Sequence, residues 1–241
     1  LNSLHSTTFE IDEKHGTDYH QKFLEFVKMV QKENLVIGGA MTDPKGDRSK
    51  GPSEQDDPDL FTRIVDKDEK GIYVSGAKAH QTGCINSHWI ILMPTVRLTE
   101  NDKDWAIVGA IPADAKGVTY IYGRQSCDTR SMEEGDIDDG NAKFGGQEAL
   151  IILDRVFIPW DKVFMHGEYE FAAMLIERFT CYHRRSYVCK TGLGDVLIGA
   201  AATIADYNGI PKVSHIKDKL IEMTHLNESI YAAGVASSYQ A

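Results

Sequence analysis

The segment from Arg178 to Lys190 holds the side chains of this chain that are best suited to chemistry. It brings an imidazole (His183), a phenol (Tyr187), a thiol (Cys189) and an ammonium group (Lys190) into one short stretch. A thiolate with an imidazole suits iron or zinc, and a phenol or an ammonium group can act as an acid, a base or an anchor for a hydroxyl group. A helical turn with a buried cysteine and solvated arginines is the alternative interpretation.

Two ligands do not complete a metal site, because structural zinc sites and iron–sulfur clusters take about four ligands each. No Cys-x-x-Cys motif occurs in the sequence. Glu222 and His225 have the spacing seen in di-iron carboxylate bundles, but such a site uses the motif twice and this chain contains it once. We therefore expect no di-iron site.

Two loops between apolar runs carry further polar groups. In Met41–Ser49, Lys45 and Arg48 could hold a phosphate, and the backbone around Gly46 could face a ring, although most such loops only connect strands. In Gly76–His88, the Thr82 hydroxyl could bond a cofactor nitrogen, and the histidines could contact a ligand. The alternative for the second loop is a solvated bulge.

Two charged residues outside these loops are also candidates. Glu148 directly precedes the apolar run Ala149–Leu153, where a desolvated carboxylate could act as a general base. An exposed glutamate at the start of a strand is the alternative. Arg124 could hold a phosphate or a carboxylate, although a surface ion pair is the more common role of such an arginine.

The composition excludes some classes of function. The formal net charge of −10 and the dispersed lysines and arginines argue against a nucleic-acid surface. No apolar run approaches the ~18 residues of a membrane helix, so we expect no membrane contact. A reducing cytoplasm is predicted because there is no signal peptide and the four cysteines are irregularly spaced: Cys84, Cys127, Cys181 and Cys189.

The elements that position these residues follow the order helix, sheet, helices. Apolar residues at helical spacing predict a helix over 18–30, behind a possible cap at Thr17 or Asp18. Short apolar runs between Gly, Pro and Asp from Gly38 onward predict a mostly antiparallel β-domain, and no dinucleotide-binding glycine motif is present. Beyond Pro159, helices are predicted over about 168–185, 194–208 and 213–237. The missing initiator Met and the helical pattern at the last residues lead us to expect part of a longer polypeptide.

Several segments in this order resemble the family of 4-hydroxybutyryl-CoA dehydratases, which are flavin and 4Fe-4S relatives of the acyl-CoA dehydrogenases. The resemblance spans nearly the whole chain. Its segments are Met41–Arg48, Gly76–Gly83, Phe144–Ala149 leading to Val156–Pro159, Tyr182–Tyr187, Cys189–Lys190, Gly194–Val196, Ala205–Gly209 and His215–Glu228.

The resemblance implies an α+β fold of the acyl-CoA dehydrogenase type, in which a β-sheet or barrel domain lies between helical segments. Residues 1–37 would end the N-terminal helical domain, 38–165 would form the flavin-binding β-domain, and 166–241 would start a truncated C-terminal helical domain. Thr82 would lie near the flavin N5 edge. The residues implied to line FAD are Met41, Thr42, Asp43, Pro44, Lys45, Gly46, Asp47, Arg48, His80, Gln81 and Thr82.

The same resemblance implies catalytic roles. Glu148 would act close to flavin and substrate, Tyr187 and Lys190 would surround the substrate hydroxyl, and His183 and Cys189 would be two ligands of a 4Fe-4S cluster. The implied reactions are dehydration of 4-hydroxybutyryl-CoA to crotonyl-CoA and isomerisation of vinylacetyl-CoA. They would use flavin-radical chemistry and an iron of the cluster as a Lewis acid.

The implied setting is a cytoplasmic homotetramer that acts on an acyl-CoA in 4-aminobutyrate fermentation. Two alternatives remain: an FAD-dependent aromatic hydroxylase of the 4-hydroxyphenylacetate 3-monooxygenase group, or a non-catalytic flavin-binding fragment.

The chain departs from the family at the cluster. The family has one more residue between its histidine and cysteine, whereas His183 and Cys189 are six apart, about 120° around a helix from a shared face. Either the helix breaks near Val188 or this ligation is lost. The family's other two cluster cysteines lie before the start of this chain, so we expect the chain alone to hold no cluster and to be inactive. We assign no role to Cys84, Cys127 or Cys181.

Overall fold

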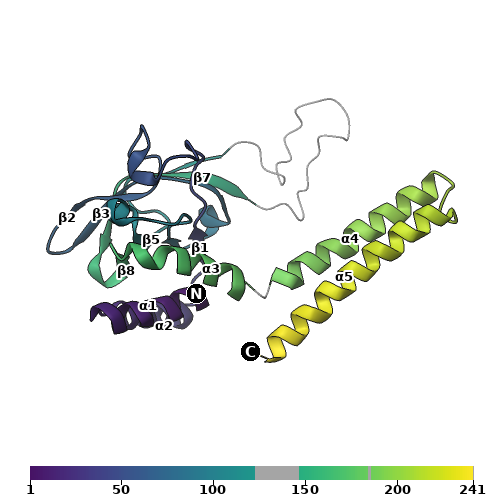
Figure 1. The fold of residues 1–241 in the computed structure, drawn as a ribbon, viewed down its shortest axis with the longest axis horizontal. Helices are drawn as coiled ribbons and strands as arrows, with labels where there is room; N and C mark the ends of the chain where they lie inside the picture. Colours follow the sequence, from purple (N-terminus) through teal and green to yellow (C-terminus); the bar gives the residue numbers. More distant parts are fainter. Residues whose placement is uncertain (123–146, 184–185, 241) are drawn as a thin grey trace. The chain divides into compact units, whose positions relative to one another are not determined.

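The computed structural model describes residues 1–122, 147–183 and 186–240 (Figure 1). Two compact units divide the chain, Leu1–Arg178 and Phe179–Ala241. The first contains helices and two four-stranded sheets, and the second is dominated by a pair of long helices.

The first unit begins with α1 (Asn2–His15) and α2 (Tyr19–Glu33), of which α2 is the helix predicted over 18–30. Neither predicted cap residue caps α2 with its side chain. Instead the Asp12 carboxylate accepts hydrogen bonds from the backbone N–H groups of Tyr19 and His20, at 2.9 and 2.8 Å. Helix α1 was not predicted, because three of its five buried residues are Ser or Thr and give a weak apolar stripe.

The β-domain consists of two sheets, which the sequence predicted to be mostly antiparallel. One sheet has the order β1 (Ile37–Ala40), β4 (Trp89–Leu92), β5 (Ile107–Pro112) and β8 (Val163–His166). The other has the order β2 (Arg63–Lys67), β3 (Gly71–Thr82), β7 (Glu148–Pro159) and β6 (Val118–Ile121). The pairings are antiparallel except for the parallel pair of β1 and β4.

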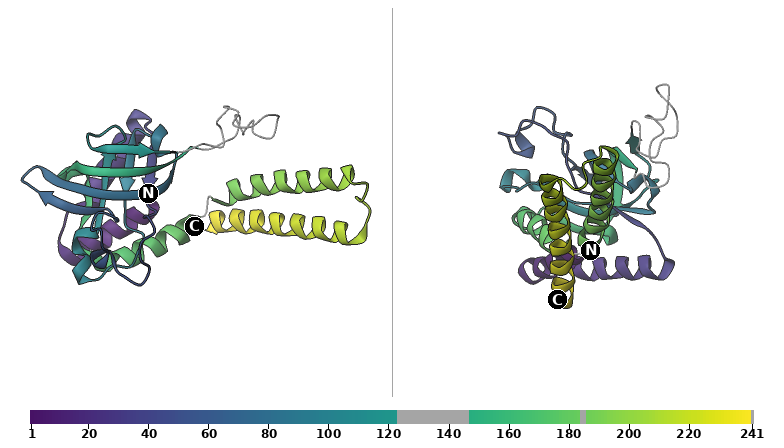
Figure 2. Two further views of the ribbon diagram at one scale, coloured as in Figure 1. Left: turned by 90° about the horizontal axis from the view of Figure 1, so that it is seen from above. Right: turned by 90° about the vertical axis from the view of Figure 1, so that its right-hand side faces the viewer.

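The apolar faces of both sheets and of α2 share one core, and Figure 2 shows the sheets and these helices from two further directions. Phe23 and Phe26 of α2 meet Phe164 of β8 with ring centroids 5.5 and 5.6 Å apart. Burial of such aromatic side chains stabilises the unit through the removal of apolar surface from water. The β-domain is thereby fixed against the first two helices.

Helix α3 (Ala172–Tyr182) starts in this core, where Ala172 and Leu175 are buried. Its Arg178 donates to Thr7 Oγ1 at 3.2 Å and forms an ion pair with Glu10, both on α1. The expectation of solvated arginines and a buried cysteine in this segment is therefore wrong for Arg178, which is paired, and for Cys181 and Cys189, which are exposed.

The second unit contains α4 (Ser186–Tyr207) and α5 (Ser214–Gln240), which run side by side (Figure 1). Asn227 of α5 donates to Asp195 Oδ1 at 2.8 Å and to the Thr191 carbonyl at 3.2 Å. The ring of Tyr187 packs over Gly234 and meets Tyr231 edge to face, with centroids 6.0 Å apart. A polar contact and an aromatic contact therefore fix the register of the two helices.

The predicted helix boundaries before α5 need correction. The helix predicted over 168–185 is shorter, because α3 ends at Tyr182, and the helix predicted from 194 begins earlier, at Ser186. The break considered near Val188 is thus found before Ser186, and Val188 lies within α4. His183 consequently follows the end of α3, whereas Cys189 lies within α4.

Helix α4 contains Lys190 and Asp195, so it is not an uninterrupted apolar run of the kind that the sequence analysis looked for. Its most apolar window has a mean hydropathy of 1.4, so by length and composition alone it could cross a membrane. The polar contacts of Thr191 and Asp195 with α5 account for two of its polar residues within the hairpin.

Gly234 and Gly199 provide a matched pair of variants for the hairpin. A Cβ atom on Gly234 would lie 2.2 Å from Tyr187 Cγ, whereas nothing lies within 4 Å of one on Gly199. We expect Gly234→Ala to lower the free energy of unfolding of the hairpin by about 1–3 kcal/mol through overpacking. Gly199→Ala should raise it by about 0.5–1 kcal/mol through helix propensity. Urea unfolding followed by circular dichroism measures both, and equal responses would contradict the close contact at Gly234.

Candidate functional site

The candidate site in the first unit lies where β3 ends and β7 begins. Thr82, the last residue of β3, pairs with Glu148, the first residue of β7, and its hydroxyl donates to Glu148 Oε1 at 2.8 Å. Both residues are exposed. Of the two interpretations of Glu148, the exposed residue at the start of a strand is therefore the one observed, and the desolvated carboxylate is not.

A β-bulge just before Thr82 determines which side chains face inward. The register of β3 against β7 shifts between Lys78 and Gln81, and His80 takes a left-handed conformation with φ of 54°. Lys78 and Gln81 are buried, whereas His80 and Thr82 are exposed. The bulge thus turns two long polar side chains inward and leaves a histidine and a hydroxyl group facing outward.

Both inward side chains hold the chain that leaves β1. We call Lys78, Gln81, Asp43 and Thr95 the clamp. The Lys78 ammonium group donates to the Met41 carbonyl at 3.0 Å, to Asp43 Oδ1 at 2.5 Å and to the Met93 carbonyl at 2.8 Å. Gln81 Oε1 accepts from the Met41 N–H at 3.0 Å, and Gln81 Nε2 donates to the Thr42 carbonyl at 2.8 Å.

The centre of the clamp is a buried ion pair. The side chains of Lys78 and Asp43 are only 2% and 6% exposed. Burial lowers the pKa of Lys78, and the neighbouring carboxylate acts in the opposite direction. Asp43 Oδ2 accepts from the Thr95 hydroxyl at 2.6 Å and from its N–H at 3.3 Å, so both charged groups are well supplied with partners, as buried charges must be.

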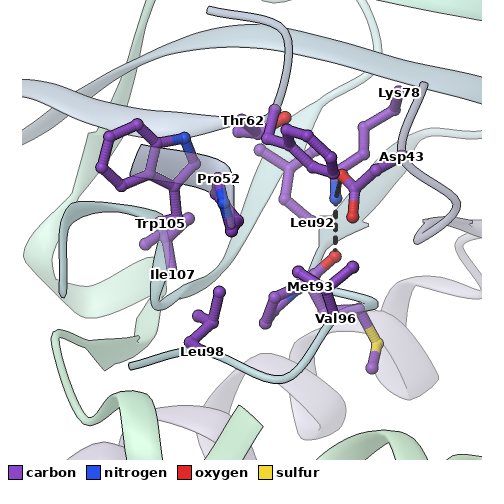
Figure 3. A pocket seen from close by; sticks show the side chains of 12 residues that line it. Asp43, Pro52, Thr62, Lys78, Leu92, Met93, Val96, Leu98, Trp105 and Ile107 are labelled. Atoms are coloured by element: carbon purple, nitrogen blue, oxygen red, sulfur yellow. Dashed lines mark hydrogen bonds and ion pairs between the residues drawn. The ribbon is translucent and has the colours of Figure 1, made fainter. Parts of the chain in front are cut away.

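A small cavity of about 10 Å³ lies beside this ion pair (Figure 3). It is lined by Asp43, Lys78, Thr62, Trp105 and several apolar side chains. Trp105 Nε1 is buried and has no hydrogen-bond partner among the described residues. A cavity of this size corresponds to about one water molecule, so it cannot hold a substrate.

The rest of the Met41–Arg48 loop is more exposed. Lys45, Asp47 and Arg48 are exposed, Thr42 is exposed, and Pro44 and Gly46 are half-buried. The backbone of Asp47 is bonded to the Gln55 side chain at 3.0 and 2.9 Å. Hydrogen bonds from Ser49 lower the pKa of Asp47. The loop therefore has a fixed backbone and free cationic ends.

The predicted residues of the Arg178–Lys190 segment lie in the second unit. His183, Cys189 and Lys190 are exposed, and Tyr187 is half-buried against Tyr231 and Gly234. Within residues 1–122, 147–183 and 186–240, no group of three or more His, Cys, Asp or Glu side chains could hold a metal ion. The structure thus joins Met41–Asp43 to β3 and Thr82 to Glu148, and it does not assemble a cluster site in the described part of the second unit.

Other candidates have structural roles or fall outside the described residues. His88 Nδ1 accepts a hydrogen bond from the Val36 N–H at 3.0 Å. This contact gives His88 a structural role that does not involve a bound ligand. Lys78 and Thr95 were missed as members of the site. For Lys78, the sequence offers only a weak signal of burial, namely its position between Ala77 and Ala79. The predictions outside the described residues concern Arg124, Cys127, Phe144–Gly146 and Arg184–Arg185.

Two models of known protein families match the sequence of this chain. Residues 1–165 match the family model described as 4-hydroxyphenylacetate 3-hydroxylase N terminal, and residues 172–241 match the corresponding C-terminal model. The chain belongs to the 4-hydroxyphenylacetate 3-hydroxylase family.

Two similar proteins have a high sequence identity with this chain. The chain is 63% identical, over 240 residues, to the 4-hydroxybutyryl-CoA dehydratase/vinylacetyl-CoA-Δ-isomerase of Clostridium aminobutyricum, covering 99% of this chain and 49% of that protein. The solved structure of an oxygen-tolerant archaeal 4-hydroxybutyryl-CoA dehydratase from N. maritimus is 94% identical, with a TM-score of 0.89 over 99% of this chain and 48% of that one. The chain therefore spans about half the length of these relatives.

Two less similar structures support the fold alone. The oxygenase component of 4-hydroxyphenylacetate 3-monooxygenase complexed with FAD is 20% identical, with a TM-score of 0.75 over 95% of this chain and 48% of that one. A probable acyl-CoA dehydrogenase from Mycobacterium abscessus is 14% identical, with a TM-score of 0.56 over 95% of this chain and 55% of that one. The predicted α+β fold of the acyl-CoA dehydrogenase type is confirmed.

The left-handed backbone of His80 leads to a prediction about stability. A non-glycine residue in the left-handed conformation destabilises the folded state by about 1–2 kcal/mol relative to glycine. Glycine, however, loses more conformational entropy on folding, which offsets about 0.5–1 kcal/mol of this difference. We expect His80→Gly to raise the free energy of unfolding by about 0.5–1 kcal/mol. His80→Ala, which keeps the strain, should change it by less than about 0.5 kcal/mol. Denaturant unfolding of the first unit tests this, and a loss of stability in His80→Gly would contradict it.

Proposed function

We propose that the complete protein dehydrates 4-hydroxybutyryl-CoA to crotonyl-CoA and isomerises vinylacetyl-CoA, and that Leu1–Arg178 supplies one wall of its FAD site. The observation that carries this proposal is the 63% identity with a dehydratase over 99% of the chain. The identity with the FAD-bound oxygenase component is only 20%, so an aromatic hydroxylase is the weaker candidate. The cytoplasmic location, the homotetramer and the role in 4-aminobutyrate fermentation belong to the same proposal and follow from the resemblance.

The residues at the end of β3 have the chemistry that FAD requires. Lys45 and Arg48 are exposed cations on a loop with a fixed backbone, which suits an anionic pyrophosphate. The hydrogen-bonded Thr82 and Glu148 are exposed polar groups that suit the edge of a flavin ring. A Cβ on Gly39 or Gly83 would meet no atom within 4 Å, so the surface beside these strands is open in this unit. When bound, FAD supplies the electron-transfer chemistry of the reaction.

Glu148 is the proposed base. Dehydration of a 4-hydroxyacyl thioester requires removal of an unactivated proton from carbon and loss of hydroxide, a poor leaving group. The Thr82 hydroxyl donates to Glu148 Oε1 and so orients the carboxylate that would accept this proton. Tyr187 and Lys190 are the proposed donors to the departing hydroxyl group.

The described residues do not fit a 4Fe-4S cluster as a complete set. His183 follows α3 and Cys189 lies in α4, and no group of three possible ligands exists in the described ranges. Four ligands are the usual requirement of such a cluster. The cluster therefore stays a proposal drawn from the resemblance, and no step of the mechanism is assigned to it.

The full-length protein, prepared without air, tests the proposed function. We expect bound FAD, bound iron and conversion of 4-hydroxybutyryl-CoA to crotonyl-CoA. FAD without iron would remove the cluster from the proposal. Hydroxylation of 4-hydroxyphenylacetate with reduced FAD and oxygen, in the absence of any dehydration, would replace the dehydratase with the hydroxylase.

The role of Glu148 can be tested in the same protein. Glu148→Gln keeps an oxygen that accepts the Thr82 hydrogen bond but cannot take a proton, so we expect turnover to fall by a factor of about 10²–10⁴ with FAD retained. Glu69→Gln, an exposed glutamate in the turn between β2 and β3, is the control and should keep full activity. Turnover is measured as crotonyl-CoA formation. Full activity in Glu148→Gln would mean that Glu148 only begins a strand.

A further inference from the structure

We propose that Lys78 is a positioning residue for FAD, and that its ion pair with Asp43 holds the Met41–Asp43 main chain in the conformation that the flavin requires. This inference rests on the proposed FAD site. It adds a residue that faces away from that site and acts through the backbone.

The contacts of Lys78 connect three separate parts of the first unit. Lys78 lies on β3, Met41 and Asp43 follow β1, and Met93 follows β4. Because β1 and β4 are parallel neighbours, their ends lie at the same edge of the sheet. One ammonium group therefore fixes both chain segments that leave this edge, which an apolar side chain of the same length could not do.

The main chain at Met41 is held from both sides. Its N–H donates to Gln81 Oε1 and its carbonyl accepts from Lys78, so the peptide groups on either side of Met41 cannot rotate independently. The Ala79 N–H also donates to the Thr42 carbonyl, at 2.8 Å. The segment that would face FAD is thus positioned by β3, and the same strand carries Thr82.

A purely structural role is the weaker explanation for the ion pair. Well-packed apolar residues commonly replace a buried ion pair without loss of stability, whereas removal of one partner leaves an uncompensated charge. A double substitution can therefore separate folding from positioning. Lys78→Met with Asp43→Asn removes both charges, and the new amide oxygen can still accept the hydrogen bond from Thr95.

The test uses full-length protein freed of FAD and compares wild type, the double variant and Lys103→Met. Lys103 is an exposed lysine that pairs with Glu100 at 3.0 Å and is outside the clamp. We expect the double variant to melt close to the wild-type temperature, to bind FAD at least tenfold more weakly and to show a shifted flavin absorption band. Lys103→Met should match wild type in all three measurements.

A milder variant covers the case in which the double variant does not fold. Thr95→Val removes one hydrogen bond to Asp43 and leaves the ion pair, so we expect FAD binding to weaken about threefold. Wild-type FAD affinity and absorption in the folded double variant would overturn the positioning role, as would wild-type affinity in Thr95→Val. If the wild-type protein bound no FAD, both this inference and the proposed function would be overturned. If the wild-type protein bound FAD and the variants bound it equally well, only this inference would be overturned.

Discussion

One interruption of β3 determines the arrangement of the candidate site. Side chains on a regular strand point alternately to its two faces, so residues three positions apart face opposite ways. The bulge at His80 adds a residue between Lys78 and Gln81, and both then point into the unit. A continuous strand would turn one of these side chains outward, and the buried carboxylate of Asp43 or the main chain of Met41 would lose a partner. The same extra residue leaves Thr82 facing outward beside Glu148.

The clamp works as a unit because its charges are buried. An ammonium group removed from water is tolerated when oxygen acceptors replace its hydration, and Lys78 has three of them. Asp43 is similarly supplied by Lys78 and Thr95. Removal of one charged partner alone would leave the other charge buried and uncompensated. The main chain that leaves β1 is therefore held more tightly than the side chains of Lys45 and Arg48. Those two side chains are exposed to solvent.

The sequence predicts the sheet domain and α2 well, because short runs such as Ile90–Leu92 and the apolar stripe of α2 satisfy a local rule of spacing. It does not predict the parallel pairing of β1 with β4 or the role of Lys78, because both depend on residues that meet only after the chain has folded. Glu148 was identified as a candidate from its place before an apolar run, yet its exposure could not be derived from that place. The helix boundary near His183 differs from the predicted one for a similar reason, because no glycine or proline between Phe179 and Thr191 marks the end of α3.

The parallel pairing of β1 with β4 also bears on the order in which the unit folds. Ile37 pairs with Trp89, so the whole β2–β3 hairpin and both loops of the candidate site lie within the loop that this pairing closes. Closing a loop of this length costs conformational entropy before any contact compensates for it, whereas β2 and β3 are joined by a short turn and can pair early. We therefore expect the Asp43 carboxylate to meet Lys78 late, when the segment that follows β1 docks against β3. On this order, Lys78 would lose its hydration at the same step at which it gains the Asp43 carboxylate, so its charge would not be buried before its partner arrives.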